Sequence, residues 1–312
     1  MLVNNPLISV VVTTKNEQIN IENCLKSIKN QSYKNYEIIV VDNFSKDETK
    51  EIARKYSDKF YQIGPERSRQ RNYGFNEFAS GEFGLYLDAD MILAPNLLKL
   101  FIENIKEGAS GYFIEEIIVG QSFFNKVRRF ERFFYNTTPI DAIRIFPLDK
   151  FKKVGGFDEQ LFVSGSGEDW DLDLKLLSLG NFQLIPKIQN RKENLEYFQE
   201  HFVGVFNKLP RRYWQLDAVL FHNETELNFF DYLKKKKYYT KGFDGYIKKW
   251  GSNNPYIKKQ FGFSYRYFKV FIEEGKWRMA LSRPHLMIAI LIYKFLVGVV
   301  YLQSKIKKDQ YV

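Results

Sequence analysis

Short apolar segments alternate with amphipathic stretches along the first third of the chain. Residues 7–13 and 36–41 are rich in β-branched side chains, as strands buried in a parallel sheet are. The stretches that follow carry apolar residues at every third or fourth position, which is the spacing of a helix that buries one side. Two further strands are expected near residues 60–63 and 81–87. This alternation predicts an α/β fold with a Rossmann-like, mostly parallel central sheet flanked by helices.

The alternation becomes less regular further along the chain. A helix is expected to open at Glu168 and to be ended by Gly180. Strands are expected after it, near residues 181–186 and 217–221. Residues 226–312 are basic and hydrophobic, and we expect them to form a helical C-terminal region after a main domain over residues 1–225.

Two carboxylates, Asp88 and Asp90, directly follow the fourth expected strand. Side chains two residues apart on extended chain point the same way, and ligands of open α/β sheets bind at the carboxyl ends of the strands. Two neighbouring carboxylates repel each other unless a cation lies between them, and a hard divalent ion holding a diphosphate fits that place. The same spacing recurs at Asp169 and Asp171, so the position after a buried strand supports the hypothesis more than the spacing does.

Family motifs narrow the class of nucleotide-binding protein. No Gly-x-Gly-x-x-Gly follows the first expected strand and no P-loop is present, which argues against a dehydrogenase and a P-loop nucleotide hydrolase. The segments VVVTTKNE, VVDNFSKDET and RSRQRNYGFNEFASGEFGLYLDAD come in the order and spacing of family 2 glycosyltransferases. Residues 7–225 resemble the GT-A enzymes of that family.

The resemblance implies an inverting glycosyltransferase with a nucleotide-binding half at residues 1–95 and an acceptor-binding half at residues 96–225. The donor would be a nucleotide-sugar, with a UDP-sugar favoured, and the cofactor Mg²⁺ or Mn²⁺. Processive members of the family carry a Gln-x-x-Arg-Trp motif. Here Arg212-Tyr213-Trp214 is the nearest segment and does not fit, so transfer of one sugar per encounter is expected.

The resemblance also implies roles for individual residues. Asp42 would contact the nucleotide base, and Arg71 would lie near the base and phosphates. Asp90 would be the closer metal ligand, with Asp88 beside it on the donor and the metal. His222 stands where many GT-A enzymes place a third metal ligand, although a lone histidine is more often structural. The donor site would also include polar residues that follow the first two strands: Thr14, Asn16, Glu17 and Ser45.

Asp169 would be the catalytic base according to the same resemblance, because the family places it in a Glu-Asp pair at a helix start. Carboxylates in the first turn of a helix are also stabilised by the helix dipole, so a purely structural role is the alternative.

Charge and hydropathy suggest a membrane. The net charge of +10 favours an anionic partner, such as lipid head groups or phosphorylated substrates. Residues 286–302 are apolar apart from Lys294 and reach only the lower limit of a bilayer span. A shallow or re-entrant membrane helix, or one docked on a partner, is therefore favoured over a true span, and a helix of the protein core is the alternative. Residues 234–237 are four lysines, and a solvated face is the default interpretation of such a run. Next to Tyr238-Tyr239 they would also attract an anionic membrane surface. Residues 121–136 form an amphipathic basic pattern, equally consistent with a helix packed on the sheet and with an interfacial one.

These features lead to an expected location and an expected acceptor. The chain has one cysteine, Cys24, and its N-terminus lacks the basic region of a signal peptide. We therefore expect a cytoplasmic protein that is peripheral or monotopic at the membrane, with a glycan or lipid-linked acceptor.

Two other functions remain possible at the level of the sequence. A sugar nucleotidyltransferase would share the sheet and the metal, but it normally has a glycine-rich loop where this chain has Thr14-Lys15-Asn16-Glu17. A non-catalytic nucleic-acid binder would account for the charge but not for acidic residues gathered at strand ends. We therefore expect no nucleic-acid partner.

Overall fold

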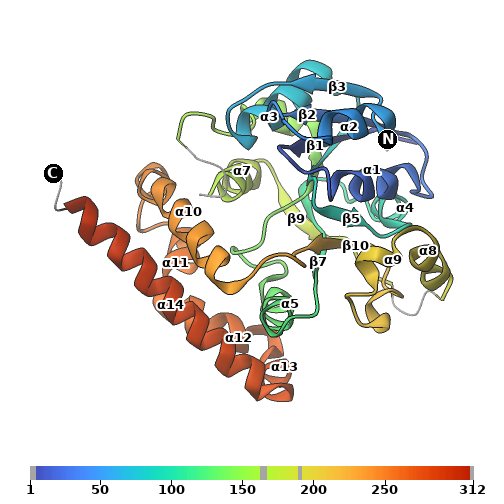
Figure 1. The fold of residues 1–312 in the computed structure, drawn as a ribbon. Coiled ribbons are helices and arrows are strands. Elements are labelled where there is room, and N and C mark those ends of the chain that lie inside the picture. Colours follow the sequence, from blue (N-terminus) through green and yellow to red (C-terminus); the bar gives the residue numbers. More distant parts are fainter. Residues whose placement is uncertain (1–4, 162–166, 189–191, 310–312) are drawn as a thin grey trace.

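The computed structural model describes residues 5–161, 167–188 and 192–309, with side chains up to residue 303. It contains two sheets and a group of C-terminal helices (Figure 1). The larger sheet has seven strands in the order β3-β2-β1-β4-β8-β6-β9. Their bounds are β1 (Ile8–Thr14), β2 (Tyr36–Asp42), β3 (Lys59–Gln62), β4 (Phe83–Asp88), β6 (Ala109–Phe113), β8 (Ile145–Pro147) and β9 (Asn181–Leu184).

The larger sheet is mostly parallel, as the sequence predicts. β1 pairs in parallel with β2 and β4, β2 with β3, and β6 with β9, whereas β8 runs antiparallel to both of its neighbours. The register sets Thr14 opposite Asp42 and Thr13 opposite Asp88. The carboxyl ends of the first, second and fourth strands therefore meet at one edge.

A second sheet of three strands, in the order β5-β10-β7, was not expected from the sequence except for its middle strand. Its strands are β5 (Met91–Leu93), β7 (Glu115–Val119) and β10 (Val219–Asn223). β10 pairs antiparallel with β5 and parallel with β7. His222 lies within β10 rather than after it, opposite Met91 of β5.

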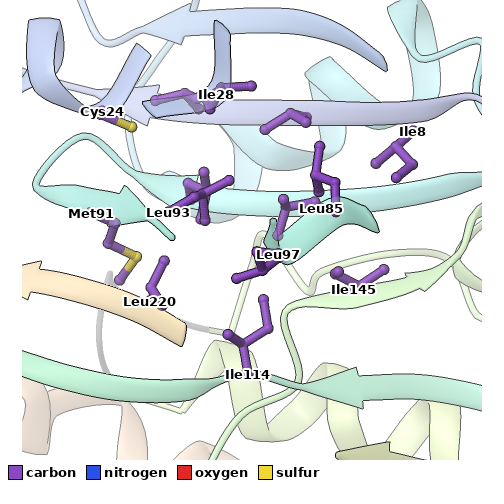
Figure 2. Packing of buried hydrophobic residues seen from close by; sticks show 14 of the residues in the cluster. Ile8, Cys24, Ile28, Leu85, Met91, Leu93, Leu97, Ile114, Ile145 and Leu220 are labelled. Carbon is purple, nitrogen blue, oxygen red and sulfur yellow. The ribbon is translucent and has the colours of Figure 1, made fainter. Parts of the chain in front are cut away.

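Helices flank the sheets between these strands. Those before residue 225 are α1 (Ile21–Lys29), α2 (Thr49–Tyr56), α3 (Arg67–Tyr73), η1 (Gly74–Phe78), α4 (Leu97–Glu103), α5 (Phe123–Tyr135), α6 (Leu148–Lys153), α7 (Glu168–Leu177), α8 (Glu193–His201), α9 (Val203–Phe206) and η2 (Arg211–Tyr213). The largest core cluster joins the two sheets: Leu85 and Ile145 of the first pack in it with Leu93 and Leu220 of the second (Figure 2). The second sheet is thereby fixed against the first.

The C-terminal region is helical, as expected, and gathers on one side of the molecule, away from α1 and α2 (Figure 1). Its helices are α10 (Phe229–Trp250), α11 (Pro255–Phe261), η3 (Tyr265–Lys269), α12 (Val270–Ile272), η4 (Glu273–Gly275), α13 (Trp277–Ser282) and α14 (Pro284–Asp309). α14 packs against α10 and α5.

α5 is the amphipathic helix of residues 121–136, and the structure favours the packed alternative for it. The side chains of Val127, Phe130 and Phe134 are buried in a cluster shared with α14. Arg129 is buried as well, and its guanidinium donates to the carbonyl of Ile118. The apolar stripe of α5 is therefore covered by neighbouring elements, and of its phenylalanines Phe123, at the start of the helix, is the exposed one.

Candidate active site

A cleft of about 820 Å³ opens at the carboxyl edge of β1 and β4 and extends to the C-terminal helices. Its walls include the ends of both strands at Thr14 and Asp88, the start of α7 at Asp169, and His222 of the second sheet. The structure thus brings Asp88, Asp90 and Asp169, which come from distant parts of the chain, to one cleft.

Arg71 connects two of these acidic residues directly. Its Nη1 lies 2.6 Å from Asp169 Oδ1 and its Nη2 lies 3.0 Å from Asp88 Oδ1. The guanidinium is fully buried and stacks 4.3 Å from the ring centroid of Tyr86. Burial alone would favour a neutral Asp88, but the guanidiniums of Arg67 and Arg71 hold the pKa of this carboxyl well below its usual range.

Arg67, which the sequence analysis did not single out, is the arginine of α3 that lines the cleft. Its Nη1 lies 3.1 Å from Asp88 Oδ2, and its Nη2 lies 2.8 Å from Glu168 Oε1. Arg71, one turn later, lies beneath the cleft surface and does not line it. The spacing of four residues between the two arginines was the available signal, because it places both on one side of a helix.

His222 and Asp90 lie side by side because β10 pairs with β5. The imidazole Nε2 is 3.1 Å from Asp90 Oδ2, and Nδ1 is 2.9 Å from Oε1 of Glu116, a β7 residue that the sequence analysis also missed. Burial opposes the charged imidazole, but the two carboxylates outweigh it and raise the pKa of His222 well above its usual range.

The residues around Asp90 fit a divalent cation. Asp90 Oδ1 is buried and has no hydrogen-bond partner among the described residues, so a lone pair is available to a ligand. Oxygen and imidazole donors suit Mg²⁺ and Mn²⁺. Both oxygens of Asp88, in contrast, already pair with arginines. Within the described part of the chain no three potential ligands are grouped closely enough to define a metal site, so Asp90 and His222 are an incomplete set.

The turns after β1 and β2 hold the other residues expected at the donor. Thr14 and Glu17 line the cleft, and Thr14 Oγ1 is buried without a described partner. Asn16 and Ser45 join the two turns, because the backbone N–H of Asn16 donates to Ser45 Oγ over 2.8 Å. Asp42 is fully buried and accepts hydrogen bonds from Ser45 and Gln62. In this structure Asp42 supports the turns and does not itself line the cleft.

Comparisons with known proteins agree with this fold. Residues 9–157 match the family model described as Glycosyl transferase family 2. Residues 9–157 therefore belong to this family, and the chain has the mixed α/β fold of GT-A glycosyltransferases. This match favours glycosyl transfer over the nucleotidyltransferase and nucleic-acid-binding alternatives.

Two curated relatives and one solved structure illustrate the similarity. The chain is 35% identical over 118 residues to a GalNAc(5)-diNAcBac-PP-undecaprenol beta-1,3-glucosyltransferase of Campylobacter jejuni, covering 35% of this chain and 37% of that protein. It is 36% identical over 109 residues to a dolichol-phosphate mannosyltransferase of Pyrococcus furiosus, covering 33% of this chain and 31% of the relative. These matches span about a third of the relatives' length.

The solved structure is a mannosyltransferase of Pyrobaculum calidifontis in complex with GDP-Man and Mn²⁺. It superposes with a TM-score of 0.57 at 16% identity, covering 97% of this chain and 87% of that one. At 16% identity, this similarity shows that the two proteins share a fold.

Proposed function

We propose that this protein is an inverting, metal-dependent glycosyltransferase that moves one sugar from a nucleoside-diphosphate sugar to an acceptor hydroxyl. The observation that carries the proposal is the single cleft in which Asp169, Asp88, Asp90 and His222 meet at the carboxyl edge of a parallel sheet. The resemblance and the family match support a nucleotide-sugar donor, and a UDP-sugar is the first candidate to test.

Asp169 is the proposed general base. Its side chain is 26% exposed and lines the cleft, and Arg71 holds one of its oxygens in place. A carboxylate fixed in this way can take the proton of an acceptor hydroxyl as that oxygen attacks the anomeric carbon opposite the leaving nucleotide. The positive side chain of Arg67 is the protein group placed to offset charge on the departing diphosphate.

Asp90 and His222 are the residues that would hold a divalent ion. Such an ion, when bound, would neutralise the donor diphosphate and stabilise it as a leaving group. Mn²⁺ in the Pyrobaculum mannosyltransferase supports this part of the proposal by analogy of fold. A cation there would also remove the proton that the two carboxylates stabilise on His222.

Calorimetry with a panel of nucleotide-sugars, with and without Mn²⁺, tests the proposal. We expect at least one nucleotide-sugar to bind, with a higher affinity in the presence of Mn²⁺. In Asp90→Asn, Mn²⁺ should no longer raise this affinity. Asp149→Asn is a matched control, since Asp149 is an exposed carboxylate in the first turn of α6 and lies outside the cleft. No nucleotide-sugar binding under either condition would refute the proposed function.

A lipid-linked acceptor and a membrane location are part of the proposal. Two relatives are named for polyprenyl-linked or dolichol-phosphate chemistry. Residues 284–303 of α14 are long and apolar enough to cross a bilayer, by length and composition alone. α14 exposes Ile288, Ile292 and Phe295 at helical spacing, which gives one outward apolar stripe. We propose that this stripe rests on an anionic membrane surface at the cytoplasmic face.

A further inference from the structure

The cleft has a second lobe beyond the proposed donor site. There it runs between α5, α10, η3 and α14, and the lobe is lined by residues of all four elements. None of these residues belongs to the family motifs, because the lobe is built mainly from the C-terminal helices. We refer to it as the cationic lobe.

Positive side chains outnumber carboxylates in the cationic lobe. Six cationic side chains of these four elements line it together with two glutamates, Glu131 and Glu224: Arg128, Arg132, Lys235, Lys236, Arg266 and Lys294. Arg132 is paired with Asp141 and Glu116. Arg128 is neutralised by both glutamates, with its Nη2 2.9 Å from Glu224 Oε1. Lys294 Nζ lies 3.5 Å from Glu131 Oε1. The positive charge that remains belongs to Lys235, Lys236 and Arg266.

Lys236 is the clearest unused cation. It is half-buried, and no described carboxylate lies within ion-pair distance of it. Its Nζ lies over the rings of Tyr232 and Tyr239, 5.0 and 5.3 Å from their centroids. Burial, followed by the charges of Arg128 and Arg266, lowers the pKa of Lys236 to about 7. Arg128 and Arg266 line the same lobe as Lys236.

A second, independent group in the lobe also lacks a partner. The hydroxyl of Tyr293 is buried on α14, lines the lobe, and makes no hydrogen bond to any described residue. Arg266 donates only to the carbonyl of Gln260, over 3.2 Å, among its described hydrogen bonds. An orphaned buried hydroxyl costs free energy unless a ligand satisfies it.

We propose that the cationic lobe binds a phosphate or diphosphate group carried by the acceptor, with Lys236, Arg266 and Tyr293 as its donors. Phosphate oxygens accept from ammonium, guanidinium and phenol groups, and a bound dianion would offset the mutual repulsion of the cations. The inference rests on the proposed function, since it gives the acceptor of that same cleft a chemical class. An acceptor anchored there would extend along the cleft toward Asp169.

The test measures binding of inorganic pyrophosphate to the full-length chain by calorimetry in EDTA and without nucleotide-sugar. Removing divalent ions separates this site from the metal-dependent donor site. We expect measurable binding of pyrophosphate. In Lys236→Gln the affinity should fall about tenfold, because one charge-assisted hydrogen bond is lost. Lys237→Gln is the matched control, because Lys237 is the exposed neighbour on α10 and lies outside the lobe. It should bind as the wild type does.

Farnesyl diphosphate in the same assay identifies the source of the phosphate. Binding tighter than that of pyrophosphate, with the same loss in Lys236→Gln, would indicate a lipid-linked acceptor. Equal binding would indicate a soluble phosphorylated acceptor. No pyrophosphate binding, or equal weakening in Lys236→Gln and Lys237→Gln, would overturn the inference. Asp90→Asn should retain pyrophosphate binding in EDTA, so failure of the donor proposal would be visible separately.

Discussion

Arg71 illustrates how a single buried residue organises the candidate site. A fully buried guanidinium is costly unless anions compensate it, and Asp88 and Asp169 do so from different elements. Tyr86 and Phe157 enclose it with ring centroids 4.3 and 5.1 Å from the guanidinium carbon. Arg71 therefore acts as a positioning residue that fixes the distance between the end of β4 and the start of α7.

Substitution of Asp169 tests the proposed base. In Asp169→Asn the amide oxygen can still accept from Arg71, so the architecture should persist while the basic group is lost. We expect donor affinity within about twofold of wild type and sugar transfer reduced by about 10²–10⁴-fold, the usual contribution of a general base. Asp149→Asn, on the exposed start of α6, should leave both unchanged.

Steady-state kinetics with calorimetric donor affinities would distinguish the roles of Asp169. A fall in donor affinity as large as the fall in rate would assign Asp169 to donor binding instead of proton transfer.

At the scale of elements, the buried charges between α5 and α14 explain how an apolar helix carries a lysine. Lys294 is 5% exposed, and its Nζ lies 2.7 Å from the Tyr135 hydroxyl and near Glu131 of α5. Arg128 of α5 and Arg266 of η3 are the cations that face it. Burial lowers the pKa of Lys294 to about 7, although Glu131 opposes this change.

The depressed pKa of Lys294 predicts a pH-dependent stability difference. Below pH 7 the lysine is charged in both the folded and unfolded states, so the folded protein bears the full cost of burying the charge. Between pH 7 and its unfolded value of 10.5 only the unfolded state retains the proton, and that cost disappears as pH rises. Lys294→Met should therefore gain stability relative to wild type at pH 6.5, and this relative gain should shrink by a few kcal/mol toward pH 9.5.

Urea unfolding of both proteins at the two pH values measures this difference. Lys237→Met, at an exposed position on α10, should show the same stability difference from wild type at both pH values. A difference for Lys294→Met that stays constant with pH would contradict a depressed pKa at Lys294.

On the scale of the whole molecule, the C-terminal helices both close the cleft and form an outer surface. α14 turns Leu286, Ile290 and Tyr293 inward, and Ile288, Ile292 and Phe295 outward. The inward residues pack on α5 and α10, whereas the outward stripe has no partner in the described chain. The cleft reaches α14 at Tyr293, Val297 and Tyr301 and not at the outward stripe. The same helix therefore lines the proposed acceptor site and carries the proposed membrane surface.

Vesicle flotation tests the membrane surface. We expect binding to phosphatidylglycerol vesicles that decreases with salt, because the charge of +10 and the apolar stripe both contribute. Ile292→Gln with Phe295→Gln should reduce binding about tenfold or more, given the apolar area that would leave the bilayer. Phe44→Gln, which changes a phenylalanine of similar exposure in the turn after β2, is the control.

The membrane proposal would fail if anionic vesicles did not bind. It would also fail if the Phe44→Gln control lost as much vesicle binding as the double variant.

The sequence alone determined the parallel sheet, its first strands and the cleft residues Asp88, Asp90 and Asp169, because local periodicity and strand-end motifs depend on neighbours along the chain. It missed β5 through β8, whose segments are short and lack a clear period, and it missed Arg67 and Glu116. Only the tertiary structure decided that Arg71 lies beneath the cleft and that Asp90 meets His222. It also decided that Lys294 turns inward, and each of these facts depends on pairing between residues far apart in sequence, which local patterns do not encode.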